Sequence, residues 1–488
     1  MLNLTNIWKR SFSSIIKDAV KAPVKNKSDL KSPVMRVKDL LCLPKSLENS
    51  KYSINGWVTQ VRKMKNLTFL SVNDGSCKDD LQIIVPQKLP SEFNVGSSVK
   101  ASGALGTTPK GQIELQVSSI DLVNTCKYPE YPLISKQQHL PQYVREFLHL
   151  RTRHKPFAAT MRVRHSAQKA FHTFFDKEGF FNIHTPILTS NDCEDSGEVF
   201  LTRPDSDKLL QEMQREGVTK ESSYFDKKSF LTVSGQLHLE AMCLGLDKVF
   251  NFNPAFRAEN SKSPCHLAEF WMIEGEIAFM DQILDLTSFV ESMIKNVTKN
   301  TLNSSAADIN YLIKCNEAES KEFDSKFKWI DKKFPVISYQ EALNILEAHS
   351  GQIKIPVKAS EGLAKNHEQF LTKHLDSPCF VAYFPKEIKP FYMKSNAEFP
   401  NLVDCFDFLV PEIGELVGGS VREFRLDALL ESIPNKKDLE WYTDLRKYGS
   451  ACTSGFGLGF ERYLQWLLNV KNIRDVISFP RWPHNCDT

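Results

Sequence analysis

The sequence has no long hydrophobic run, no paired cysteine motif and little net charge. No apolar stretch reaches the roughly 18 residues that a membrane-spanning helix needs, so we expect no membrane partner. The eleven cysteines include no CxxC pair, which argues against a zinc ribbon or a thioredoxin motif and favours a reducing compartment. The net charge is only +3, so any binding to nucleic acid must depend on local patches.

The positive charge is concentrated at the start of the chain. Residues 1–31 carry seven basic residues and two acids, with apolar residues between them. A basic, Ser-containing and acid-poor amphipathic segment is typical of a mitochondrial transit peptide. We therefore predict a transit peptide at 1–31 and a location in the mitochondrial matrix. The alternative is a disordered basic tail.

The chain divides by composition into two main parts. Residues 32–124 contain five short β-rich runs separated by Gly, Asn-Asp-Gly and Pro turns, which predicts a small barrel of the OB type. Residues 125–155 are rich in Pro, Tyr, His and Arg and are interpreted as a hinge. Residues 156–488 form the second domain, and 281–400 is interpreted as an insertion within it because Lys, Asn, Ser and Glu dominate there.

Residues 256–276, FRAENSKSPCHLAEFWMIEGE, carry the densest chemical signal. The preceding strand alternates between Phe250, Phe252 and Phe256 on one face and Asn251, Asn253 and Arg257 on the other. A hairpin of this kind is expected to bury its aromatic face and to present Arg257, Phe270 and the following acids on a common surface. Arg257 would hold a phosphate or carboxylate with two hydrogen bonds, and Phe270 would stack on a base. An amphipathic hairpin with ordinary surface charges is the alternative.

A glycine-rich segment, GFGLGFER, occupies residues 455–462 near the end of the chain. It differs from a dinucleotide fingerprint because Phe460 stands at the third glycine position. It follows two other features in order: a helix predicted over 161–179 that leads to a strand at Pro186, and the hairpin. Together the three resemble the motifs of class II aminoacyl-tRNA synthetases.

The resemblance covers nearly the whole chain beyond residue 32 and implies an α+β fold. In that fold an OB barrel precedes a catalytic domain whose antiparallel sheet is flanked by helices. An N-terminal OB domain marks the subgroup for aspartate, asparagine and lysine. HLAEFWMIEGEIAF and GFGLGFERYLQWLL look like the asparagine branch rather than the aspartate branch, and the final RWPHNC looks like organellar forms.

The resemblance implies an ATP site. Arg257 would bridge the α-phosphate and the substrate carboxylate, Phe270 and Arg462 would enclose the adenine, and His266 would reach the terminal phosphates. Arg257 and Arg462 are the implied catalytic residues. Asp407 and Glu415 would hold Mg²⁺. The other residues implied to contact ATP are Glu259, Leu267, Glu415 and Gly459.

The resemblance also implies an amino-acid site. Glu194 and Gln236 would hold the α-ammonium group with Ser234 alongside, and Arg422 would donate to the side-chain carbonyl oxygen. Glu259 is the hypothesised acceptor for the amide nitrogen. Asp195 stands where the family usually has glycine, so closure of that loop is expected to differ.

Three residues on the predicted OB strands match anticodon contacts of the subgroup: Arg62, Phe69 and Gln82. An exposed aromatic on such a barrel can stack an unpaired base. Because LTFLSV alternates Leu67 and Phe69 against Thr68 and Leu70, the sequence leaves open whether Phe69 instead belongs to the barrel core.

The expected function is that of a homodimeric mitochondrial enzyme. It would join asparagine and ATP into asparaginyl-adenylate and then transfer the acyl group to tRNA-Asn, with 161–186 at the dimer contact. Three alternatives remain open at this point: an aspartate-specific synthetase, a synthetase-like enzyme that makes free asparagine, and an inactive RNA-binding paralogue.

Overall fold

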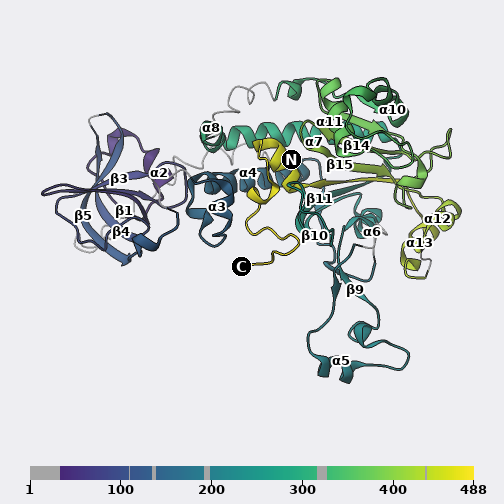
Figure 1. Ribbon diagram of the computed structural model, residues 1–488, viewed down its shortest axis with the longest axis horizontal. Helices are drawn as coiled ribbons and strands as arrows, with labels where there is room; N and C mark the ends of the chain where they lie inside the picture. The colour runs from purple at the N-terminus through teal and green to yellow at the C-terminus, as the bar shows by residue number, and fades with distance from the viewer. Residues whose placement is uncertain (1–32, 109, 134–138, 192–197, 316–326, 435–436) are drawn as a thin grey trace, which may run out of the picture. The chain divides into compact units, whose positions relative to one another are not determined.

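The computed structural model describes residues 33–108, 110–133, 139–191, 198–315, 327–434 and 437–488 (Figure 1). The predicted transit peptide therefore lies outside the described residues. The chain forms two compact units, residues 1–136 and 137–488. Each unit has its own core.

The first unit is a closed five-stranded barrel with strand order β1-β2-β3-β5-β4, as predicted. Alternate residues point inward, so Leu70 and Val72 of β2 are buried while Phe69, which precedes Leu70, is only half-buried. The short helix α2 precedes the barrel. The elements are α2 Val37–Leu41, β1 Lys51–Lys63, β2 Thr68–Asn73, β3 Leu81–Val85, β4 Ser98–Thr107 and β5 Ile113–Asn124.

The second unit is built on an eight-stranded sheet with order β12-β13-β14-β15-β16-β11-β10-β6. All neighbouring pairs are antiparallel except β12 with β13 and β10 with β6. The strands are β6 Phe181–Asn182, β10 Lys248–Phe256, β11 Glu269–Ala278, β12 Val336–Ser338, β13 Cys379–Ala382, β14 Cys405–Val410, β15 Gly414–Val421 and β16 Thr453–Gly459.

Helices cover one face of this sheet and form the main core (Figure 1). The predicted long helix is α4, Lys155–Lys177, and Gly179 follows its end with φ +81°, a left-handed angle that glycine adopts without strain. Its aromatic residues pack with α14 and the sheet, and Phe175 stacks on Phe250 at 4.3 Å between ring centres. The other helices are α3 Pro141–Arg145, α5 Asp207–Met213, α6 Gln236–Leu246, α7 Ile283–Ser304, α8 Ala306–Cys315, α10 Tyr339–Ala348, α11 Lys365–His374, α12 Leu426–Ser432, α13 Glu440–Lys447 and α14 Phe460–Leu468.

The segment 281–400, predicted to be an insertion within the second domain, packs closely with the rest of that unit where it is described. Helix α7 buries Leu286, Val290 and Val297 in the main core because these residues recur at helical spacing on one face. Strands β12 and β13 extend the sheet at its edge. Its polar composition reflects the solvent faces of its helices, and the segment is part of the unit's own architecture.

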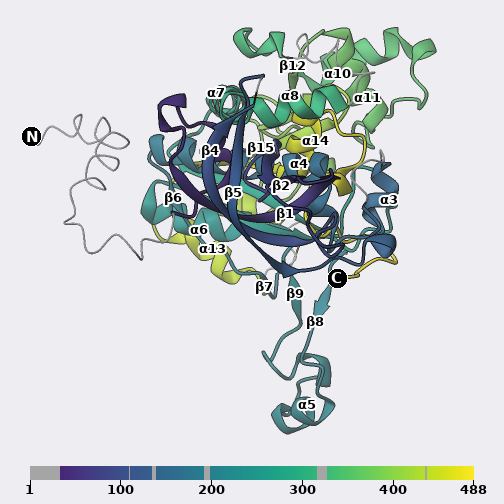
Figure 2. The same cartoon turned by 90° about the vertical axis from the view of Figure 1, so that its left-hand side faces the viewer.

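A small three-stranded sheet of β7, β9 and β8 extends away from the main sheet, with α5 at its far end (Figures 1 and 2). These strands are β7 Leu188–Thr189, β8 Leu201–Thr202 and β9 Ser229–Leu231. Among the described helices, none is both long enough and apolar enough to cross a membrane.

Candidate active site

Strands β10 and β11 pair as the predicted hairpin, with Asn251 opposite Glu274 and Phe252 opposite Ile273. The aromatic face packs on the main core, where Phe252 stacks on Trp271 at 5.2 Å. The expectation that the acids lie on an open surface is wrong for two of them. Glu274 is 2% exposed and Glu276 is fully buried, because α6 and the side chain of Arg422, which follows β15, cover this second face.

The glycines of GFGLGFER line the same second face. In the antiparallel register Gly455, Gly457 and Gly459 lie opposite Glu276, Glu274 and Met272, whereas Phe456 and Leu458 between them enter the core. A Cβ atom on Gly455 would collide with the side chains of both Glu276 and Arg422. The glycines therefore leave this face of β16 without side chains. The space above it holds the buried Glu276 and Arg422 side chains and the pocket.

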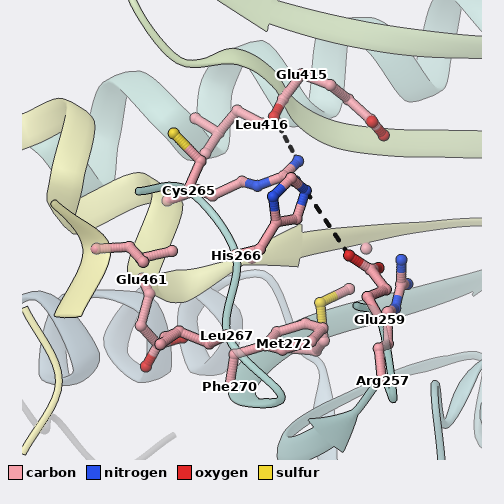
Figure 3. Close-up of a pocket in the computed structure, with 14 residues that line it drawn as sticks. Arg257, Glu259, Cys265, His266, Leu267, Phe270, Met272, Glu415, Leu416 and Glu461 are labelled. Carbon is pink, nitrogen blue, oxygen red and sulfur yellow. Dashed lines mark hydrogen bonds and ion pairs between the residues drawn. The ribbon is translucent and has the colours of Figure 1, made fainter. Parts of the chain in front are cut away.

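A pocket at this face brings together all eight residues predicted to contact ATP (Figure 3). They come from three separate parts of the chain: the hairpin and its loop, the start of β15, and the junction of β16 with α14. Their roles remain predictions. These residues are Arg257, Glu259, His266, Leu267, Phe270, Glu415, Gly459 and Arg462.

The cationic side chains of the pocket differ in their contacts. The guanidinium carbon of Arg257 lies 5.6 Å from the centre of the Phe270 ring. Arg462 donates from Nη1 to the backbone oxygen of Glu415 at 3.2 Å. In this structure the cation that neighbours Phe270 is thus Arg257, while Arg462 enters the same pocket from α14.

His266 is held by the loop in which it lies. Its Nδ1 is 2.6 Å from the Ser263 hydroxyl, and its Nε2 is 3.8 Å from the Glu259 carboxylate (Figure 3). Burial, with a smaller contribution from Arg462, lowers the pKa of the imidazole. A neutral ring that can donate or accept one hydrogen bond is therefore favoured at neutral pH.

The two predicted metal carboxylates, Asp407 and Glu415, both lie next to Gly418. Lys389 donates to both oxygens of Asp407, at 2.7 and 2.8 Å. Burial raises the pKa of the Asp407 carboxyl to about 6, Lys389 opposes that shift and Glu415 adds to it. Asp407 is thus engaged by a lysine that the sequence did not point to, and Glu415 is the member of the pair that lines the pocket.

The donor set fits magnesium only in part. No cluster of three or more His, Cys, Asp or Glu residues suited to a metal occurs in the described part of the chain. Mg²⁺ commonly takes one or two protein carboxylates and fills its remaining positions with phosphate oxygens and water. Glu415 alone meets that minimum, whereas both oxygens of Asp407 already accept from Lys389.

The residues predicted for the amino acid lie around a second buried network. Ser234 donates its hydroxyl to Glu274, and Gly235 and Asn251 donate to the same carboxylate at 2.9 and 2.8 Å. Ser234 therefore supports the turn that precedes α6. Gln236 begins α6, and its Oε1 accepts a hydrogen bond from the Tyr392 hydroxyl at 3.1 Å.

Arg422 is almost completely buried and forms a bidentate pair with Glu276. Its Nη1 also donates to Ser420 at 2.7 Å, and its guanidinium lies 5.1 Å from the Tyr392 ring. Burial lowers the pKa of Arg422, but the Glu276 carboxylate outweighs burial and raises it. The carboxylate that touches Arg422 is Glu276, whereas Glu259 lies with His266 in the pocket.

Glu194 and Asp195 lie outside the described residues. Glu198 is the next described residue, and its backbone oxygen accepts a hydrogen bond from the Ala258 amide at 2.8 Å. Glu198 therefore contacts the residues that follow β10. Sequence reasoning missed Glu276, Tyr392 and Lys389. The alternation of β11 was the available signal for Glu276, since it places that acid on the same face as Glu274.

On the barrel, the three predicted RNA contacts lie on neighbouring strands. Arg62 and Phe69 are cross-strand partners, and the Arg62 guanidinium lies 4.5 Å from the Phe69 ring centre. Gln82 on β3 is half-buried and donates to Glu114 at 2.9 Å. Phe69 alternates with the buried Leu70, so it belongs to the outer surface and not to the barrel core.

Comparison with known proteins agrees with this architecture. The family model described as tRNA synthetases class II (D, K and N) matches residues 141–483, and the model of the OB-fold nucleic acid binding domain matches residues 52–123. The fold and the pocket thus define a class II aminoacyl-tRNA synthetase with an N-terminal OB domain.

Relatives narrow the assignment further. Asparaginyl-tRNA synthetase of Mus musculus is 40% identical over 93% of this chain and 94% of its own length, and that of Homo sapiens is 41% identical over 89% and 90%. The crystal structure of asparaginyl-tRNA synthetase from Pyrococcus horikoshii with asparaginyl-adenylate has a TM-score of 0.80 at 30% identity, covering 94% of this chain and all of that one. The chain belongs to the asparaginyl-tRNA synthetase family.

Proposed function

We propose that this chain activates asparagine with ATP and transfers it to tRNA-Asn. The observation that carries the choice of amino acid is the Arg422–Glu276 pair. An arginine in an amino-acid site attracts a carboxylate, but here a buried carboxylate already neutralises its charge. A neutral amide is therefore the better ligand, because an aspartate side chain would bring an uncompensated negative charge into a buried site.

The first step joins two anions, and the pocket lowers the barrier mainly by position and charge. The substrate carboxylate attacks the α-phosphorus, the bond to the bridging oxygen breaks and pyrophosphate leaves. Arg257 would hold the carboxylate and the α-phosphate in line and stabilise the charge that develops. Arg462 and neutral His266 would bind the outer phosphates. Mg²⁺ held by Glu415 would neutralise phosphate charge.

Two finer features are part of the proposal. The amphipathic basic segment 1–31 supports import into the mitochondrial matrix. The edge strand β6 supports a homodimer, because Phe181 there is 56% exposed and Leu188 of β7, the next strand along the chain, is 51% exposed. Fusing residues 1–31 to a fluorescent reporter tests the first, and light scattering of a Phe181→Lys variant tests the second.

The decisive experiment is ATP–pyrophosphate exchange with asparagine and with aspartate in parallel. We expect exchange with asparagine, and loss of this exchange in an Arg257→Ala variant that still binds tRNA. Exchange with aspartate alone would identify an aspartate enzyme, and no exchange with either amino acid would identify an inactive paralogue.

A further inference from the structure

A cysteine and a lysine meet at the edge of the pocket. Cys265 lies in the loop between β10 and β11, lines the pocket and is 8% exposed. Lys365 is the first residue of α11, in the segment 281–400. Its Nζ donates to the Cys265 Sγ at 2.7 Å. The contact thus joins the loop that carries His266 to a helix a hundred residues further along the chain.

A buried amide completes this group. Gln465 on α14 is 2% exposed, and its Nε2 lies 4.0 Å from the Cys265 Sγ. Its Oε1 has no hydrogen-bond partner among the described residues. A buried acceptor without a partner is costly. An S–OH group formed on Cys265 would supply the hydrogen that this oxygen lacks.

We propose that Cys265 and Lys365 form a reversible covalent cross-link when the protein meets hydrogen peroxide. In the first step peroxide oxidises the thiol to a sulfenic acid and is reduced to water. In the second step Nζ first passes a proton to the oxygen of the sulfenate. Its lone pair then attacks sulfur, an S–N bond forms, the S–O bond breaks and a second water leaves with an amine hydrogen. The protein loses two hydrogen atoms, and two equivalents of a small thiol restore thiol and amine.

Position favours this outcome over simple oxidation. The amine lies within van der Waals distance of the sulfur before any chemistry occurs. The Lys365 side chain therefore does not have to move before the S–N bond forms. Cys265 lines the pocket and is 8% exposed, which lets a molecule as small as peroxide reach the thiol. The cross-link fixes the His266 loop to α11 at the entrance to the phosphate region. This consequence for ATP rests on the proposed function, whereas the bond itself does not.

The experiment treats the full-length protein with hydrogen peroxide, with and without ATP, and digests it for mass spectrometry. We expect a peptide pair joined through Cys265 and Lys365 that lacks two hydrogen atoms and separates with dithiothreitol. ATP should slow its formation. Asparagine-dependent exchange, measured on the same samples, should fall as the linked fraction rises and recover on reduction.

Two variants separate the cross-link from other damage. Cys265→Ser should yield no linked pair, and Lys365→Met should instead accumulate a sulfenic acid at Cys265 that dimedone captures. A wild-type protein that shows only dimedone-captured sulfenic acid, or an unreacted Cys265 thiol, would overturn the proposal. A linked pair without any exchange activity before oxidation would leave the cross-link standing and contradict the proposed function alone.

Discussion

Arg422 and Glu276 face each other across β16 with Nη2–Oε2 and Nε–Oε1 distances of 2.8 and 2.9 Å. Neither side chain has appreciable contact with solvent. The two charges of the pair cancel, and this is the physical basis for the proposed preference for an amide over a carboxylate.

Glu276→Gln should shift the preference from asparagine towards aspartate. The substitution keeps the shape of the side chain and leaves the Arg422 charge uncompensated, so an aspartate carboxylate becomes the better counter-ion. We expect the ratio of exchange rates with asparagine and aspartate to fall by about tenfold or more, which corresponds to ~1.4 kcal/mol. Glu347→Gln, an exposed position on α10, is the control. An unchanged ratio would show that the pair does not set specificity.

Gly455→Ala should destabilise the protein and impair activation. The added Cβ would collide with both members of the Arg422–Glu276 pair, and overpacking of this kind costs about 1–3 kcal/mol. Chemical denaturation and pyrophosphate exchange measure the two effects. Gly245→Ala is the matched control because no atom lies within 4 Å of its Cβ position and alanine favours helix α6. Equal stability of the two variants would contradict the prediction.

Phe69→Ala should weaken tRNA binding and leave amino-acid activation intact. The ring lies on the outer barrel surface beside Arg62, where stacking on a base contributes about 1–3 kcal/mol. We expect the Kd for tRNA to rise at least about fivefold, with unchanged asparagine-dependent exchange. Val123→Ala, an exposed position on β5 of the same barrel, is the control. If Phe69→Ala and Val123→Ala bind tRNA equally well, the barrel face that carries Phe69 does not bind tRNA.

Glu368→Gln should change how stability depends on pH. Burial, with Glu415 adding to it, raises the pKa of the Glu368 carboxyl to about 7 from its ordinary 4.5. Between these two values the folded protein binds more protons than the unfolded chain, so Glu368 lowers the free energy of unfolding as pH rises. The slope from this one group is at most about 1.4 kcal/mol per pH unit.

The test compares urea unfolding of wild type and Glu368→Gln from pH 5 to 7 without nucleotide. The wild type should lose stability relative to the variant across this range, and the difference should level off above it. Taking the difference removes the contributions of other groups, such as His154, whose pKa burial lowers to about 4. Parallel curves would show that Glu368 titrates normally.

The sequence alone determined the local features. The alternation of β10 and β11, the five strands of the barrel and the long helix α4 follow from short-range patterns of apolar and turn residues. The glycines of β16 were recognisable in the same way. Arg257 and Phe270 were also predicted from the hairpin pattern, whereas the other six predicted ATP contacts were named only through resemblance to a family.

Only the tertiary structure decided which polar groups meet. Arg422 reaches Glu276 because β16 lies between β15 and β11 in the sheet and carries no side chain at Gly455. Lys389 donates to Asp407, and Lys365 donates to Cys265. Both lysines belong to the segment 281–400, whose composition alone had suggested an insertion. Periodicity fixes which face a residue is on. Strand order and register fix its partner across that face, and those depend on contacts between residues far apart in the sequence.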